Sequence, residues 1–167
     1  MKNLYTKVGI GLTTRLITKE DIETLAEVYT DVYKNLDIGE HWEKSSAMKM
    51  LTYWFEKQPD LAYLAEYEGK IVGAFLVAVK PWWDGNQLFD GEIFTHPDFH
   101  GKGIGTALLK KVLTESKNIY DAKFWYAFTY TGSEHPLSWY KKVGFKVPDQ
   151  YVMFQGSISE VLKNLEK

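Results

Sequence analysis

Helical spacing of apolar residues dominates the first third of the chain, after a short extended segment. Residues 12–18 are expected to form a strand, and Thr18 followed three residues later by Asp21 is the pattern of a capping box that opens a helix. A second helix is expected at 44–56, with Pro59 just past its end. Both helices carry an apolar face, at Ile22, Leu25, Tyr29, Val32 and Tyr33 in the first and at Met48, Leu51 and Phe55 in the second.

The middle of the chain changes to the pattern of strands. Residues 61–67 and 71–79 flank the turn Glu68-Gly69, which predicts a β-hairpin. The second of these strands is apolar throughout, so we expect it to lie in the centre of a sheet and to be covered on both faces. Asp84-Gly85-Asn86 predicts another reversal before a strand at 87–95.

Helix and strand patterns alternate in the second half. A glycine-rich segment at 100–105 precedes a helix that is expected to run to about Ser116. The elements expected after it are a strand at 123–130, a short helix near 136–143, a strand at 145–154 and a last helix opened by the capping box of Ser157 and Glu160. The order β-α-α-β-β-β-α-β-α-β predicts an α/β fold, a mixed sheet with helices on both faces, in a single domain over 1–167.

Composition narrows the function classes. The 167 residues are 45% hydrophobic, which is ample for one core. A net charge of -2 and a single arginine, Arg15, argue against a nucleic-acid partner. The absence of cysteine excludes disulfides, thiolate metal sites and an acyl-cysteine intermediate, and no cluster of ligand residues suggests a metal. Without a signal-peptide run in 1–14 or an apolar stretch of ~20 residues, the expectation is a cytoplasmic protein with no membrane segment.

The glycine-rich segment is the most informative stretch. The strand before it ends at Pro97, and Gly101, Gly103 and Gly105 then lead into a helix. Glycines permit positive φ and close phosphate approach, and the first N–H groups of a helix favour an anion, so the pattern predicts a pyrophosphate cradle. A dinucleotide fingerprint needs glycine where Leu108 stands, and a Walker A loop needs Ser or Thr after Lys102. Both fail, and a glycine-rich connection without a ligand is the remaining alternative.

The pattern His100-x-x-Gly103-x-Gly105 resembles the coenzyme-A-binding motif of the GNAT superfamily of N-acetyltransferases, in which Arg or Gln usually stands at the position of His100. The resemblance implies acetyl-CoA as co-substrate, with its pyrophosphate on 100–106. It also implies that the strand before the loop pairs with the pantetheine arm, and that the next strand separates from it to leave room. The implied cofactor-binding residues are Ile93, Phe94, Thr95, His100, Gly101, Lys102, Gly103, Ile104, Gly105, Thr106, Ser133 and Tyr140.

Tyr140 carries a second resemblance, since a tyrosine four residues before Gly-Phe at a helix end is the other signature of that family, and Gly144 suits a helix C-cap. The implied role of Tyr140 is to protonate the departing thiolate, and a phenol with a pKa near 10 holds its proton at neutral pH. The alternative is a core tyrosine. Ser133 stands where the family often has an asparagine that touches the cofactor.

Two carboxylates on the strand before the loop are candidates for the general base. Glu92 matches a position where several family members carry a glutamate base, which acts directly or through water; the alternative is a solvated strand carboxylate. Asp90 shares its sheet face by alternation and is a second candidate, or a binding group for a cationic substrate. His96, which precedes a proline, is expected to be structural, and His41 and His135 have no supporting context.

The resemblance implies that the binding site for the acceptor amine is built by the first two helices, their loop, and the link between the third and fourth strands. Carboxylates beside indoles suit a cationic amine, so a small cationic amine or a peptide amine is the expected acceptor. The alternative is that these side chains are core aromatics and a solvated rim. The candidate substrate-binding residues are Trp42, Trp82, Trp83, Asp84 and Asp90, with Asp37, Glu40 and Glu43 near them in sequence.

Two other classes of function stay open at this point. One is a catalytically inert module that senses acetyl-CoA, and the other is an interaction protein whose exposed tryptophans bind a partner without a cofactor. A homodimer is possible by superfamily habit, and no residue pattern indicates it.

Overall fold

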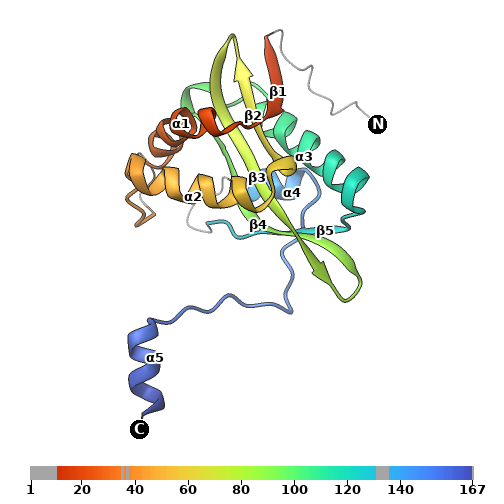
Figure 1. Cartoon of the computed structure of the whole chain (residues 1–167). Coiled ribbons are helices and arrows are strands. Elements are labelled where there is room, and N and C mark those ends of the chain that lie inside the picture. The colour runs from red at the N-terminus through yellow and green to blue at the C-terminus, as the bar shows by residue number, and fades with distance from the viewer. Residues whose placement is uncertain (1–10, 35, 37, 131–135, 167) are drawn as a thin grey trace. The chain divides into compact units, whose positions relative to one another are not determined.

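A mixed sheet with helices on both faces forms the described part of the chain, which confirms the predicted fold class (Figure 1). The computed structural model describes residues 11–34, 36, 38–130 and 136–166. The elements are β1 (Leu12–Leu16), α1 (Ile22–Lys34), α2 (Lys44–Lys57), β2 (Ala62–Tyr67), β3 (Lys70–Trp82), β4 (Gly85–Thr95), α3 (Ile104–Tyr120), β5 (Phe124–Tyr126), α4 (Leu137–Lys142) and α5 (Ile158–Leu165).

The sheet has five strands in the order β1-β2-β3-β4-β5. The first four strands are antiparallel neighbours, and β5 pairs parallel to β4 after the crossover through α3. The chain divides into two compact units, Met1–Phe128 and Thr129–Lys167. The first unit holds the sheet with α1, α2 and α3, and the second holds α4 and α5. A single domain over 1–167 stays a prediction.

Strand β3 lies in the centre of the sheet and is buried on both faces, as its apolar sequence predicts. Ala74, Leu76 and Ala78 belong to the core beneath α1 and α2. Phe75 and Val77 alternate with them and are equally buried, so they point to the opposite face, where α3 packs (Figure 1).

Helix α1 begins where the capping box predicts. A 3₁₀ turn at Lys19–Asp21 leads into it, and the Asp21 carboxylate accepts a hydrogen bond from the backbone N–H of Thr18 at 2.8 Å. The same carboxylate accepts two hydrogen bonds from Arg15, at 2.7 and 2.8 Å. The single arginine of the chain therefore anchors the entry to α1.

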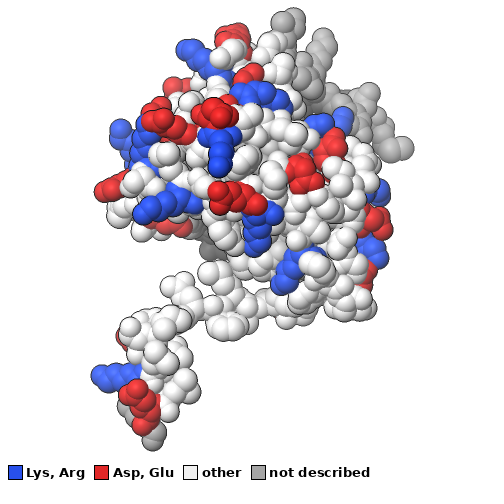
Figure 2. Space-filling model, viewed as in Figure 1, with Lys and Arg blue, Asp and Glu red and all other residues white. Residues whose placement is uncertain are grey.

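The apolar faces of α1 and α2 meet over the sheet. The predicted inward residue Leu25 of α1 and Leu51 of α2 are fully buried there. At the rim, the Lys44 ammonium lies 2.7 Å from carboxylate oxygens of both Glu23 and Glu27 and links the two helices. Figure 2 shows basic and acidic side chains interspersed over this face.

Helix α3 runs past its predicted end at Ser116, to Tyr120. The Ser116 hydroxyl donates to the Leu113 carbonyl at 3.0 Å, so its side chain has a hydrogen-bond partner within the helix. The helix ends at Asp121, which adopts the left-handed conformation with φ 49°. No helix among the described residues is long and apolar enough to cross a membrane.

The strand predicted at 145–154 is wrong. Those residues form no strand in the structure, and Tyr151, Val152 and Phe154 are exposed. A strand exists only where a neighbour accepts and donates its backbone hydrogen bonds, and Pro148 removes one donor from this segment. The helix predicted after Ser157 is present as α5.

Candidate active site

A β-bulge in β4 turns the strand directly before Glu92. Leu76 pairs with Glu92 and Ala78 pairs with Phe89, so two residues of β4, Asp90 and Gly91, stand opposite a single residue of β3. Both have positive φ, 55° at Asp90 and 103° at Gly91. The bulge places the side chain of Glu92 on the same sheet face as Leu76, beneath α1.

Replacing Gly91 by alanine should lower the free energy of unfolding by about 3 kcal/mol, from left-handed strain and overpacking together. A Cβ at Gly91 would lie 2.5 Å from the Leu76 carbonyl oxygen and 2.9 Å from Cβ of Val77. Urea unfolding measures the change. The matched control is Gly69→Ala, where φ is +77° and no atom lies within 4 Å of the added Cβ. An equal loss in both variants would contradict the steric argument.

Glu92 is partly buried, and α1 supplies its hydrogen-bond partner. The Tyr29 hydroxyl donates to Oε2 of Glu92 at 3.1 Å. Burial raises the pKa of Glu92 to about 7; the hydrogen bond from Tyr29 opposes that rise, and the charges of Asp90 and Glu40 add to it. A carboxylate with a pKa near neutrality can accept a proton efficiently at physiological pH. The environment is therefore not that of a solvated strand carboxylate.

The bulge interrupts the simple alternation between Asp90 and Glu92, so their predicted place on one sheet face stays a prediction. The two carboxylates are nevertheless close enough for the Asp90 charge to raise the pKa of Glu92. Burial also raises the pKa of Asp90 itself, and the charge of Lys57 lowers it. The indole N–H of Trp125 on β5 donates to the Asp90 backbone carbonyl at 2.8 Å and holds the bulge.

Beyond the bulge, no strand among the described residues pairs with β4 on its β5 side. Its pairing with β5 ends at Phe89 and Tyr126 within the described residues, so the two strands separate there as predicted. His96 donates its backbone N–H to the Val72 carbonyl on β3 at 2.8 Å. Because backbone groups alternate in direction along an antiparallel strand, those of Phe94 also point to β3, whereas those of Ile93 and Thr95 point to the open side.

The glycine-rich segment connects this edge to α3. Gly101 and Gly103 have φ of +77° and +81°, and nothing lies within 4 Å of a Cβ built at either, as the cradle prediction requires. Gly105 lies inside the first turn of the helix. The first bond within the helix runs from the Ala107 N–H to the Gly103 carbonyl, at 2.9 Å. The N–H groups of residues 104–106 therefore have no partner of their own within the helix.

His100 and Lys102 pack back onto the protein beside the loop. A ring nitrogen of His100, Nε2, lies 3.0 Å from the Thr95 backbone oxygen. The Lys102 ammonium lies 4.8 Å from the centroid of the Tyr67 ring, a cation–π contact. This contact keeps one positive charge beside the helix N-terminus.

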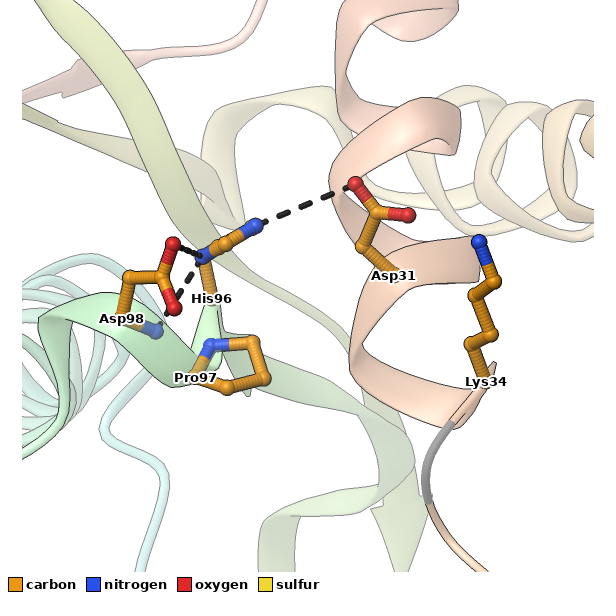
Figure 3. A pocket seen from close by; sticks show the side chains of 5 residues that line it. All are labelled: Asp31, Lys34, His96, Pro97 and Asp98. Atoms are coloured by element: carbon orange, nitrogen blue, oxygen red, sulfur yellow. Dashed lines mark hydrogen bonds and ion pairs between the residues drawn. The ribbon is translucent and has the colours of Figure 1, made fainter.

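His96 has the structural role that its position before proline predicts. Its Nδ1 accepts a hydrogen bond from the Asp98 backbone N–H at 3.2 Å and caps the short 3₁₀ turn Pro97–Phe99. Its Nε2 lies 3.8 Å from a carboxylate oxygen of Asp31 on α1. Together with Pro97 these side chains and Lys34 line a surface pocket of about 270 Å³ (Figure 3).

Of the predicted acceptor residues, the structure brings Trp42 towards Glu92. Trp42 meets the Tyr29 ring edge-on, with 5.2 Å between centroids, and its indole N–H donates to Oε2 of Glu40 at 2.6 Å. Trp82 and Trp83 are exposed near the tip of the β3–β4 hairpin. Trp82 lies six residues after Leu76, the β3 residue that pairs with Glu92. At the usual rise of a strand this is a distance of about 20 Å.

Asp84 lies at the same hairpin tip, where its carboxylate accepts a hydrogen bond from the Gln87 amide at 3.0 Å and its backbone oxygen accepts one from Lys123 at 2.5 Å. The hairpin-tip residues therefore do not join Glu92 in one site. Of the other carboxylates expected near the acceptor, Glu43 stands at the N-cap of α2, and Asp37 lies outside the described residues.

Comparison with known proteins decides the family. A family model described as the acetyltransferase (GNAT) family matches residues 22–145. The chain belongs to the GNAT family. An uncharacterized N-acetyltransferase of Methanocaldococcus jannaschii is 30% identical over 141 residues, which cover 80% of this chain and 60% of that protein. This chain therefore spans less than two thirds of that relative.

Solved structures share the fold. A predicted acetyltransferase from Clostridium acetobutylicum, solved with acetyl-CoA, superposes with a TM-score of 0.61 at 19% identity, covering 86% of this chain and 96% of that one. Arabidopsis thaliana Naa50, in complex with the bisubstrate analogue CoA-Ac-MVNAL, superposes with a TM-score of 0.61 at 17% identity over 83% of this chain and 85% of its own.

The second GNAT signature lies in the other unit of the chain. Tyr140 is on α4, its carbonyl accepts the Phe145 N–H at 3.0 Å, and Gly144 has the positive φ, 106°, expected after a helix end. The position of Tyr140 relative to Glu92 stays a prediction. Ser133 lies outside the described residues. Among the described residues, no group of three or more His, Asp or Glu is placed to hold a metal ion.

Sequence reasoning missed the role of Tyr29, which it placed only in the apolar face of the first helix. The available signal was chemical: a tyrosine on an apolar helix face carries a hydroxyl that needs a partner when it is buried. Tyr29 is 1% exposed, and the partner is Glu92.

Proposed function

We propose that this protein transfers the acetyl group of acetyl-CoA to a primary amine, by direct attack of the amine in a ternary complex. The observation that carries the proposal is one continuous arrangement in the first unit. A partly buried carboxylate with a pKa near 7 precedes an open strand edge, and that edge leads into two left-handed glycines at the start of a long helix. Membership of the GNAT family supports it.

Acetyl-CoA fits the residues present. The backbone N–H and carbonyl of Ile93 and the N–H of Thr95 face the open edge, where the amides of a pantetheine arm would pair as an added strand does, while the Thr95 carbonyl lies 3.0 Å from Nε2 of His100. The N–H groups of residues 104–106, the positive end of the α3 dipole and the open space at Gly101 and Gly103 suit a pyrophosphate. The C. acetobutylicum neighbour was solved with this same molecule.

Glu92 and Tyr140 have separate roles in proton transfer, one as base and the other as acid. Glu92 takes the proton that the acceptor ammonium must lose before its nitrogen attacks the acetyl carbon. Tyr140, on α4, is assigned to give its proton to the thiolate that leaves. Acetyl-CoA supplies the activated acetyl thioester, and the rings of Trp42 and Phe94 pack against Tyr29 beside the carboxylate.

The acceptor is a small cationic amine or a peptide amine. Glu40, Trp42 and Tyr33 lie around Tyr29 and Glu92, so an approaching ammonium meets carboxylates and aromatic rings. Naa50 was solved with a bisubstrate analogue that joins CoA to a peptide, which supports including peptides among the acceptors.

Isothermal titration with acetyl-CoA, followed by a thiol-release assay, tests the proposal. The acceptor panel consists of monoamines, polyamines, aminoglycosides and peptides with a free N-terminus. We expect saturable binding and amine-dependent release of CoA thiol. Binding without turnover on any amine would favour a sensing module, and absence of binding would overturn the proposal in favour of an interaction protein.

A further inference from the structure

Tyr29 connects the core of the protein to Glu92. It lies in the middle of α1, 63 residues before Glu92 in the chain, and its hydroxyl donates to Oε2 at 3.1 Å. Its ring is held by edge-on contacts with Phe94, at 5.0 Å between centroids, and Trp42, at 5.2 Å. A ring held on several sides keeps its hydroxyl in one place, so the carboxylate that it binds is also held.

Several groups face Glu92 from the elements packed around it. α1 contributes the hydroxyls of Tyr29 and Tyr33, whose rings lie 4.5 Å apart between centroids. The α1–α2 connection contributes the charge of Glu40, and β4 contributes that of Asp90, on which Lys57 of α2 acts in turn. Among these groups, the Tyr29 hydroxyl stabilises the ionised form of Glu92 by donating a hydrogen bond to it, whereas Asp90 and Glu40 oppose ionisation.

We propose that Tyr29 is the positioning residue for Glu92: its hydroxyl holds Oε2, so that Oε1 is the oxygen that accepts the proton from the acceptor ammonium. The inference rests on the proposed acetyl transfer. An N–H bond of the ammonium breaks and its proton joins Oε1. The electron pair left on nitrogen then forms the bond to the acetyl carbon as the carbon–sulfur bond breaks and the thiolate leaves with a proton from Tyr140. The nitrogen releases its second proton to solvent as the amide forms, and Tyr140 regains a proton from solvent.

Tyr29 keeps its own proton during this step. Burial and the neighbouring charge of Glu92 both raise the pKa of Tyr29 above its ordinary value, so the hydroxyl donates to the carboxylate throughout the working pH range. A donor fixed in this way favours the ionised carboxylate and opposes the effect of burial.

Tyr29→Phe tests the inference through the pH profile of kcat/KM for an amine accepted by the unmodified protein. A hydrogen bond to a charged group contributes roughly 1.5 kcal/mol or more, so the acid limb should move up by about one pH unit. The kcat value should fall, and the Kd for acetyl-CoA should stay the same. The matched control is Tyr63→Phe, since Tyr63 is also buried but pairs with Phe75 on the other sheet face.

A second variant covers the case in which Tyr29→Phe does not fold. Site-specific 3,5-difluorotyrosine at position 29 keeps the ring and the hydrogen bond but makes the phenol a stronger donor. It should therefore move the acid limb in the opposite direction, to lower pH. Profiles that superimpose on those of the unmodified protein in both variants would overturn the inference while acetyl transfer stands. A lack of transfer by the unmodified protein at every pH would instead overturn the proposed function, and this inference with it.

Discussion

Replacing Glu92 by glutamine should lower kcat/KM for acetyl transfer at pH 7 by about 10²–10⁴-fold, the usual contribution of a general base. Glutamine keeps the shape of the side chain and an oxygen that accepts from Tyr29, but it cannot take up the proton of the ammonium. A thiol-release assay measures the rate, and titration with acetyl-CoA should give an unchanged Kd. In the unmodified protein, kcat/KM should rise with pH through about 7 as Glu92 ionises.

Asp90→Asn is the matched control, because it makes the same change of carboxylate to amide two residues away. Its effect on kcat/KM at pH 7 should be much smaller. A large loss in Asp90→Asn with a small one in Glu92→Gln would transfer the role of base to Asp90. Small losses in both would leave the transfer without a carboxylate base.

The same glutamine variant should be more stable than the unmodified protein at pH 8. The pKa of Glu92 is raised from 4.5 to about 7 in the folded chain, so folding favours the protonated form. That stability is fully present below pH 4.5 and is lost as the pH rises through 7. Glutamine stays neutral, so the gain at pH 8 is roughly 3 kcal/mol at most and shrinks towards pH 5. Urea unfolding at three pH values measures the difference in unfolding free energy between the two proteins. A gain that does not change with pH would contradict the explanation that the raised pKa of buried Glu92 causes it.

Local pattern was enough to predict most of the helices and the central strand. Leu25, Leu51 and Leu108 lie where helical spacing puts them, fully buried, and β3 is covered on both faces. The left-handed conformations of Gly101 and Gly103 also follow from local chemistry, because glycine is the residue that adopts them without strain. These features depend on residues close together in sequence.

The features that shape the candidate site depend on partners far along the chain. At the bulge, Asp90 and Gly91 of β4 stand opposite a single residue of β3. The sequence of β4 by itself does not indicate how many residues of β3 it faces. The bond from Tyr29 to Glu92 joins residues 63 positions apart. The strand predicted at 145–154 is wrong for the same reason, because β-propensity in the segment does not supply a neighbouring strand.

Replacing Gly103 by glutamate should weaken acetyl-CoA binding by about 100-fold or more, the largest effect expected on the cofactor side. A glutamate there must adopt φ +81°, which costs about 1–2 kcal/mol in the left-handed region. Its carboxylate also stands at the N-terminus of α3, where it competes with a pyrophosphate for the N–H groups of residues 104–106 and repels it. The strain is the same with and without acetyl-CoA, so the loss of affinity comes from the competition and the repulsion, roughly 3 kcal/mol or about 100-fold in Kd.

Gly39→Glu makes the same substitution at the same kind of backbone position, with φ +78° and nothing within 4 Å of the added Cβ. It adds the same charge outside the loop, so its Kd for acetyl-CoA should stay within about threefold of that of the unmodified protein. Isothermal titration compares the three proteins, and circular dichroism checks that each is folded. If Gly103→Glu bound acetyl-CoA as tightly as Gly39→Glu, the pyrophosphate would have to lie elsewhere than on the start of α3. If both variants lost binding equally, added negative charge alone would explain the loss, and the cradle at Gly103 would have no special part in it.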